Sequence, residues 1–223
     1  MNGRSNVFLL KNEKWNILID TSVSWNRKKL ESQLKKLNIN NIDLIIITHT
    51  HFDHVTNAGV FKEKYNSKIL VHHSEVRNIE KGFKELPMGT NLVTQFLIDK
   101  IGYRLMKLFS YTPCTCDIIV ESFFDLKPFG FDAYIMHTPG HSIGSISVIV
   151  DNEIAIVGDA MFGLLPWSVF PPFADDVSQM VIGWGILLET GCTIFLPAHG
   201  RSCSRELLKK EYSKKVSKLQ INL

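Results

Sequence analysis

The residues best suited to chemistry are grouped in one short stretch, Thr48-His49-Thr50-His51-Phe52-Asp53-His54. Three imidazoles and one carboxylate fall within six residues. They directly follow the apolar run 42–47, whose β-branched and leucine residues are typical of a buried strand. The polar cluster therefore lies where a strand ends, and this is the edge at which α/β proteins bind ligands.

The spacing of these residues suits metal binding. In extended backbone, His49 and His51 point to the same side and can hold one metal ion. Asp53 and His54 come from the following turn and can reach a second ion. Neutral imidazole suits zinc, iron, copper and nickel, while a carboxylate adds negative charge that lowers the cost of holding two cations together. The alternative interpretation is a solvated polar loop that happens to be rich in histidine.

Three further ligand-type residues follow other strand-like runs later in the chain, and these are His141, Asp159 and His199. Each is expected at its own strand end. His72 and His73 also follow a short apolar run, but a helix start comes next. We interpret both as surface residues, with contact to substrate or metal as the alternative.

The order of predicted elements begins β-β-α-β and continues into a second, strand-rich half. The first half contains predicted strands at 7–10, 15–19, 42–47 and 68–72, with an amphipathic helix at 25–37. The second half contains predicted strands at 118–122, 131–137, 146–150, 154–157 and 193–196, with a helix that starts near 176 and is closed by Gly191.

A helical insertion at about 83–116 interrupts this alternation. Its apolar residues repeat at intervals of three and four, which predicts one or two helices with a broad apolar face: Leu92, Val93, Phe96, Leu97, Ile101, Leu105 and Leu108. Such a segment either adds to the core or forms a lid over a pocket, and a homodimer or membrane-surface contact is the alternative. A basic amphipathic helix is predicted at about 204–219, and we expect residues 1–223 to form a single domain.

Composition limits the class of protein. The chain has 223 residues, of which 45% are hydrophobic and 21% charged, as in an ordinary globular protein. A net charge of +3 gives no case for nucleic acid as a partner. No secretion signal and no apolar run long enough to span a membrane are evident. The four cysteines form no zinc-ribbon spacing, so we expect reduced thiols and a cytoplasmic location.

The complete series His-x-His-x-Asp-His, His, Asp, His resembles the metallo-β-lactamase-fold hydrolases over about residues 6–200. The segments 138–142 (Thr-Pro-Gly-His-Ser) and 158–160 (Gly-Asp-Ala) are similar in style to the glyoxalase-II and lactonase branches. The resemblance implies an α+β fold, a four-layer αβ/βα sandwich with metals at one edge between two sheets. It also implies the ligands position by position: His49, His51 and His141 for a first ion, Asp53, His54 and His199 for a second, and Asp159 as the bridge between them.

The activity that this resemblance implies is cleavage of an ester, thioester or lactone bond of a small molecule. Two Zn²⁺ would share a bridging hydroxide, and Asp53 would orient it, so that no nucleophilic Ser or Cys is needed. His51, where the diiron flavoprotein branch has Glu, favours zinc, with iron as the alternative. Three other functions stay open: a phosphodiesterase, a mononuclear-iron oxygenase acting on a persulfide, and a non-catalytic binding protein on the same fold.

Substrate contacts are expected from the insertion and from the loop 164–173, which is rich in proline and aromatic residues. Trp167 and Phe170 in this loop suit a hydrophobic acyl, lactone or aryl group. Arg201, two residues after His199, is a candidate for holding a substrate carboxylate or phosphate. The alternatives are core packing for the loop and a surface position for the arginine.

Overall fold

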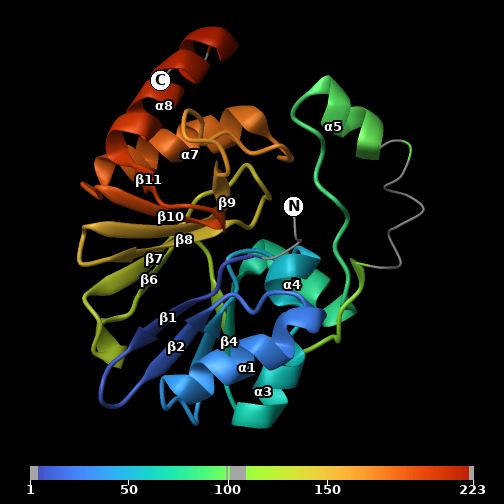
Figure 1. The fold of residues 1–223 in the computed structure, drawn as a ribbon, viewed down its shortest axis with the longest axis vertical. Coiled ribbons are helices and arrows are strands. Elements are labelled where there is room, and N and C mark those ends of the chain that lie inside the picture. Colours follow the sequence, from blue (N-terminus) through green and yellow to red (C-terminus); the bar gives the residue numbers. More distant parts are fainter. Residues whose placement is uncertain (1–4, 99, 101–108, 221–223) are drawn as a thin grey trace. The chain divides into compact units, whose positions relative to one another are not determined.

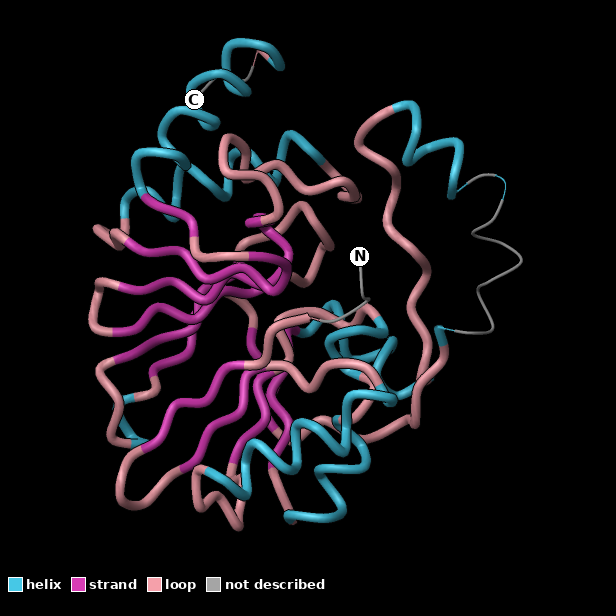
Figure 2. The backbone as a smooth tube through the Cα atoms, in the orientation of Figure 1, coloured by secondary structure: helices cyan, strands magenta, loops and turns pink. Residues whose placement is uncertain are grey.

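The computed structural model describes residues 5–98, 100 and 109–220. The chain divides into two compact units. One comprises Met1–Glu85 and Leu105–Glu121, and the other Leu86–Arg104 and Ser122–Leu223. Each unit contains its own sheet and its own helices (Figures 1 and 2). The prediction that residues 1–223 form one domain stays a prediction.

The described part of the first unit forms a five-stranded sheet in the order β1-β2-β3-β4-β5. Its strands are β1 (Phe8–Lys11), β2 (Asn16–Ile19), β3 (Leu44–Ile46), β4 (Lys68–His72) and β5 (Ile118–Val120). Its helices are the 3-10 turn η1 (Ser24–Asn26), α1 (Arg27–Lys36), α2 (Phe52–Val55), α3 (Ala58–Tyr65) and α4 (His73–Lys81). β1 and β2 form the predicted hairpin, while β2, β3, β4 and β5 are parallel neighbours. The β-β-α-β opening is thereby confirmed.

One face of this sheet packs against its helices. Successive side chains along each strand point to opposite faces, so every second side chain points to the helices. A buried cluster joins this strand face to side chains of α1, α3 and α4: Leu18, Ile45, Ile47, Ile69 and Val71 from the sheet, with Leu34, Phe61 and Ile79 from the helices. The parallel strands are apolar on the opposite face as well, which is typical of a sheet inside a layered fold.

The described part of the second unit forms a six-stranded sheet in the order β11-β10-β9-β8-β7-β6. Its strands are β6 (Phe123–Asp125), β7 (Ala133–His137), β8 (Ile146–Val150), β9 (Ile154–Gly163), β10 (Ile194–Gly200) and β11 (Cys203–Ser204). Its helices are α5 (Leu92–Leu97), the 3-10 turn η4 (Lys127–Phe129), α7 (Val177–Glu189) and α8 (Arg205–Leu219). A core of buried residues joins α7 and α8 to this sheet, with Trp184 wholly buried and its indole N–H donating to the Ala160 carbonyl at 2.7 Å.

One predicted strand in the middle of the chain differs from the structure, and one predicted helical segment is described in part. The strand predicted at 118–122 ends at Val120, because the chain bends at Glu121 and Ser122 and enters the other sheet as β6 at Phe123. In the insertion, α5 begins after Asn91, whose side chain accepts hydrogen bonds from the backbone N–H groups of Val93 and Thr94. The remaining predicted helical repeat, with Ile101, Leu105 and Leu108, lies outside the described residues.

Candidate functional site

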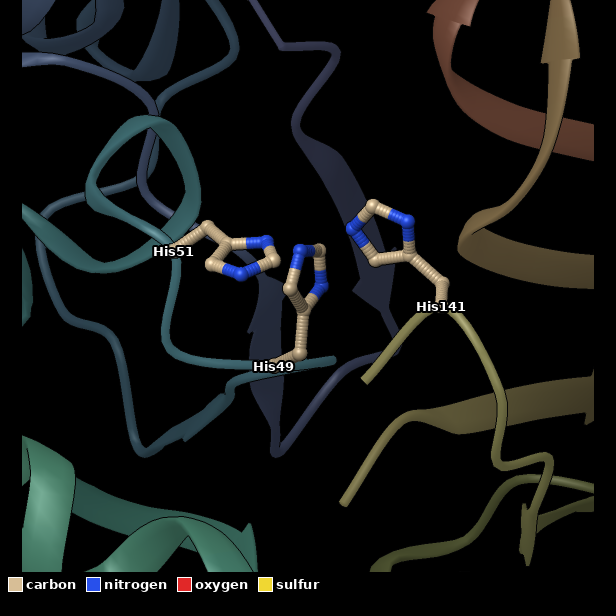
Figure 3. A group of neighbouring side chains, drawn as sticks. All are labelled: His49, His51 and His141. Carbon is tan, nitrogen blue, oxygen red and sulfur yellow. The ribbon is translucent and has the colours of Figure 1, made fainter. Parts of the chain in front are cut away.

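The first group of predicted ligands lies in the loop and short helix that follow β3. His49 and His51 stand on the loop, and Asp53 and His54 stand on α2. The His49 ring centroid is 4.6 Å from that of His51 and 4.0 Å from that of His54. Figure 3 shows the neighbouring rings of His49 and His51. His49 and His54 are fully buried, and the Asp53 side chain is 13% exposed.

A buried carboxylate that was not predicted as a site residue holds His54. Asp20, directly after β2, is 1% exposed, and its Oδ2 lies 2.8 Å from His54 Nδ1. The Thr48 N–H donates to Asp20 Oδ1 at 2.8 Å, and the Thr48 hydroxyl donates to the same carboxylate. A carboxylate accepts hydrogen bonds, so the proton of a neutral His54 ring lies on Nδ1 and the lone pair on Nε2.

His141 lies in the turn after β7 in the second unit and is 2% exposed (Figure 3). Its Nδ1 is 2.9 Å from the Phe173 carbonyl oxygen, which can only accept, so the lone pair of the neutral ring is again on Nε2. The preceding Gly140 has a φ of +126°, a conformation that side-chain-bearing residues rarely adopt. The tight turn therefore requires glycine next to a predicted ligand.

Asp159 and His199 complete the set in the second unit. Asp159 Oδ2 lies 3.5 Å from His141 Nε2 and 3.4 Å from His199 Nε2. Both residues were predicted after their strands end, and this is wrong, because Asp159 lies within β9 and His199 within β10. The two strands pair in parallel with register shifts on both sides of Pro197. Such irregularities change the direction in which side chains point, so a residue within a strand can point toward a site at the end of the sheet.

The donor set fits a metal ion that accepts imidazole and carboxylate ligands. Each of the seven predicted residues offers an imidazole nitrogen or a carboxylate oxygen that could join a metal-binding group. In two of them, His54 and His141, a hydrogen bond at Nδ1 fixes the tautomer that presents Nε2. Metal-bound histidines in proteins commonly have such a partner on the second ring nitrogen.

The candidate substrate residues lie in three different settings. Trp167 is 64% exposed at a turn between Leu165 and Ser168. Phe170 is partly buried, with Lys215 Nζ 3.1 Å above its ring and Trp184 at an edge-to-face angle of 90°. Arg201 is exposed after β10, and its backbone N–H donates to the Gly163 carbonyl.

The insertion connects to the segment that holds His141. Gly89 and Phe173 form a bridge of antiparallel pairing, and the Thr90 N–H donates to the Pro172 carbonyl at 3.0 Å. The Ala174 N–H donates back to the Met88 carbonyl at 2.9 Å. Beyond this connection, α5 exposes an apolar face that contains Leu92, Val93, Phe96 and Leu97. The face is not core packing, so the first of the two predicted roles for the insertion does not apply to α5.

No helix within the described ranges combines the length and apolar character needed to cross a membrane. In comparisons with known proteins, residues 2–181 match the family described as the metallo-β-lactamase superfamily. A probable metallo-hydrolase of Methanocaldococcus jannaschii is 33% identical over 167 residues, which are 74% of this chain and 72% of that protein. A hydroxyacylglutathione hydrolase of Haemophilus influenzae is 24% identical over 60% of this chain and 57% of that protein.

The fold matches a solved structure of the same superfamily. The crystal structure of an archaeal metallo-β-lactamase superfamily protein from Sulfolobus tokodaii superposes with a TM-score of 0.64 at 20% identity, covering 99% of this chain and 84% of that one. The α+β fold predicted from the ligand series is confirmed by this match. Together with the sequence match over most of its length, this means that the chain belongs to the metallo-β-lactamase superfamily of metallo-hydrolases.

Proposed function

We propose that the protein is a metal-dependent hydrolase that cleaves an ester, thioester or lactone bond of a small molecule. The observation that carries the proposal is the tautomer that Asp20 and the Phe173 carbonyl impose on His54 and His141. A solvated histidine-rich loop does not need its rings buried and locked in this way. Family membership supports the same conclusion.

The proposed ligand sets follow the predicted series. His49, His51 and His141 hold one ion, Asp53, His54 and His199 hold a second, and Asp159 serves both. Two Zn²⁺ in such a site would supply a hydroxide at neutral pH and a Lewis acid for the bond under attack. Asp53, whose side chain is 13% exposed at the start of α2, would accept a hydrogen bond from that hydroxide and orient it.

An acyl substrate with an apolar part agrees best with the surroundings. The Haemophilus relative is named for a hydroxyacyl conjugate, which supports an acyl bond over a phosphodiester. The exposed apolar face of α5 and the exposed Trp167 are available to the acyl group. We also place the protein in the cytoplasm, because its four free cysteines suit a reducing compartment.

Metal content tests the proposal first. Protein purified without added metal should contain about two zinc ions per chain by inductively coupled plasma mass spectrometry. About one iron per chain would contradict it and favour oxidation of a persulfide, which oxygen consumption would reveal.

Turnover tests the bond class. Carbonyl esters, thioesters and lactones should be hydrolysed faster than bis-p-nitrophenyl phosphate, and the reverse order would favour a phosphodiesterase. The variant Asp53→Ala should lose at least about a hundredfold in turnover. The control is Asp43→Ala, because Asp43 lies just before β3, at the opposite end of the strand, and in the described contacts its side chain accepts hydrogen bonds from Asn16 and Asn41. Near-normal rates for Asp53→Ala would refute the assigned role.

A further inference from the structure

A second buried carboxylate lies beneath the loop that contains His49 and His51. Glu75, in the first turn of α4, is fully buried and belongs to none of the predicted ligand sets. Its Oε2 accepts from the backbone N–H of Thr50 at 3.3 Å and also from the Thr50 hydroxyl. The side-chain amide of Asn78 donates to the same oxygen at 3.2 Å. Glu75 therefore holds the residue between the two histidines by both its backbone and its side chain.

Because of the position of Thr50, its hydrogen bonds to Glu75 act on His49 and His51. Thr50 is fully buried and is covalently bonded to both His49 and His51. Successive side chains in extended backbone point to opposite sides, so a threonine held on one side directs both neighbouring imidazoles to the other. A shift of Thr50 would move both rings together. The carboxylate thus acts on two proposed ligands through one residue.

The charge of Glu75 is balanced within the same unit. Lys84 Nζ lies 2.5 Å from Glu75 Oε1, and the Lys84 side chain is only 9% exposed. A buried carboxylate is costly unless it is paired and its other lone pairs are satisfied. Here Glu75 Oε1 pairs with the Lys84 ammonium, and Oε2 accepts hydrogen bonds from Thr50 and Asn78. This division lets a charged carboxylate remain under the loop.

We propose that Glu75 is a positioning residue for the metal site, which sets the placement of His49 and His51 through Thr50. This inference rests on the proposed function, because it assumes that the two histidines bind metal. It predicts that the affinity for metal depends on a residue that does not itself contact the ion. Removal of outer partners of this kind weakens metal binding about 10- to 100-fold in proteins.

The test variant is Glu75→Gln, which preserves shape. A glutamine has one acceptor oxygen, so either Lys84 or Thr50 loses its acceptor. The matched control is Glu211→Gln. Glu211 is also buried, accepts from the Ser168 hydroxyl at 2.7 Å and pairs with Lys214 at 3.6 Å. Among the described residues, neither of these partners is adjacent to a proposed metal ligand. Both substitutions should lower the melting temperature, and they differ in what else they change.

The readouts are the Zn²⁺ dissociation constant, measured against a chelating dye, and the visible absorption spectrum with Co²⁺. Glu75→Gln should bind Zn²⁺ at least about tenfold more weakly and shift the Co²⁺ bands, while Glu211→Gln stays within about twofold of wild type. The milder pair Thr50→Val and Thr50→Ser covers the case in which Glu75→Gln does not fold. Valine, which lacks the hydroxyl donor, should weaken Zn²⁺ binding, and serine should restore it.

The outcomes separate the two proposals. Equal Zn²⁺ affinities for Glu75→Gln and Glu211→Gln, or for Thr50→Val and Thr50→Ser, would overturn the positioning role alone. Wild-type protein that binds neither Zn²⁺ nor Co²⁺ would overturn the proposed function and the positioning role together. Tight metal binding that weakens in Glu75→Gln supports the role even where no tested ester is cleaved.

Discussion

Replacing Asp20 with asparagine should change which nitrogen of His54 carries the proton. Asn Oδ1 can still accept from the Thr48 N–H, but the amide nitrogen then faces His54 Nδ1, where Asp20 now accepts at 2.8 Å. Two donors cannot pair, so Nδ1 must become the acceptor and the proton moves to Nε2. Asp20 has a φ of +59°, which asparagine tolerates as well as aspartate, so the backbone is not strained further.

The magnitude follows from the loss of one outer partner. A ring protonated on Nε2 must change tautomer before it can bind metal, and substitutions of this kind weaken affinity about 10- to 100-fold, or about 1.4–2.8 kcal/mol. The metal-free protein also exchanges a buried hydrogen bond to a charged acceptor, which contributes about 1.5–3 kcal/mol to the free energy of unfolding, for one between neutral groups, which contributes about 0.5–1.5 kcal/mol. The substitution should therefore lower stability and metal affinity by comparable amounts.

Two measurements distinguish these effects. Nitrogen-15 spectra of the metal-free protein should show His54 protonated on Nδ1 in the wild type and on Nε2 in Asp20→Asn. Zn²⁺ competition should show the weaker affinity. Asp43→Asn is the control, since the Asp43 side chain accepts the backbone N–H of Asn16 at 2.8 Å and its partners in the described part of the chain include no proposed ligand. An unchanged tautomer in Asp20→Asn, or a Zn²⁺ affinity equal to that of Asp43→Asn, would refute the reasoning.

Three further predictions follow from local geometry. Gly140→Ala should lower the free energy of unfolding by more than about 2 kcal/mol, because the added Cβ would lie 2.1 Å from a backbone nitrogen of α7. Gly191→Ala should lose less in urea unfolding, because at φ +80° its added Cβ would meet the Asn152 carbonyl oxygen at an ordinary contact distance of 3.9 Å. Burial raises the pKa of the Cys203 thiol to about 11, so it should react with a disulfide reagent at pH 8 only after unfolding, and fast labelling of folded protein would contradict this. Burial alone would raise the pKa of Asp117, but hydrogen bonds from Lys62 and a backbone N–H outweigh burial and lower this pKa. The charged carboxylate therefore stabilises the fold at pH 6. The loss of stability caused by Asp117→Asn should shrink as the pH falls below 3.8. Urea midpoints that differ equally at pH 6 and pH 2.5 would contradict that sign.

The sequence was sufficient to select the candidate ligands that are close together in the chain. His49, His51 and His54 follow the apolar run 44–47, so the strand and the polar loop after it are visible as one local pattern. The short helix that carries Asp53 and His54 was not predicted, because its four residues give no helical period. The residue types nevertheless identified the group.

The length of β9 depends on pairing between strands that are distant in the sequence, and for this reason it was not predicted. Gly158-Asp159 was interpreted as the end of a strand, since glycine and aspartate are unfavourable there. β9 in fact continues to Gly163, because β10 pairs with it in parallel across register shifts. No local pattern of the chain contains this information. The same holds for Phe173, whose backbone carbonyl holds His141 from 32 residues away.

The parallel order of the first sheet explains why two carboxylates, Asp20 and Glu75, contact the loop that follows β3 and carries His49 and His51. β3 lies between β2 and β4, and all three strands run in the same direction. Their carboxyl ends therefore meet at one edge, and the loop after β3 lies between the residues that follow its two neighbours. Asp20 directly follows β2, and Glu75 is the third residue after β4. Each contributes a buried carboxylate, one to Thr48 and His54 and the other to Thr50, so the orientation of the histidines depends on the neighbouring strands as much as on the motif itself.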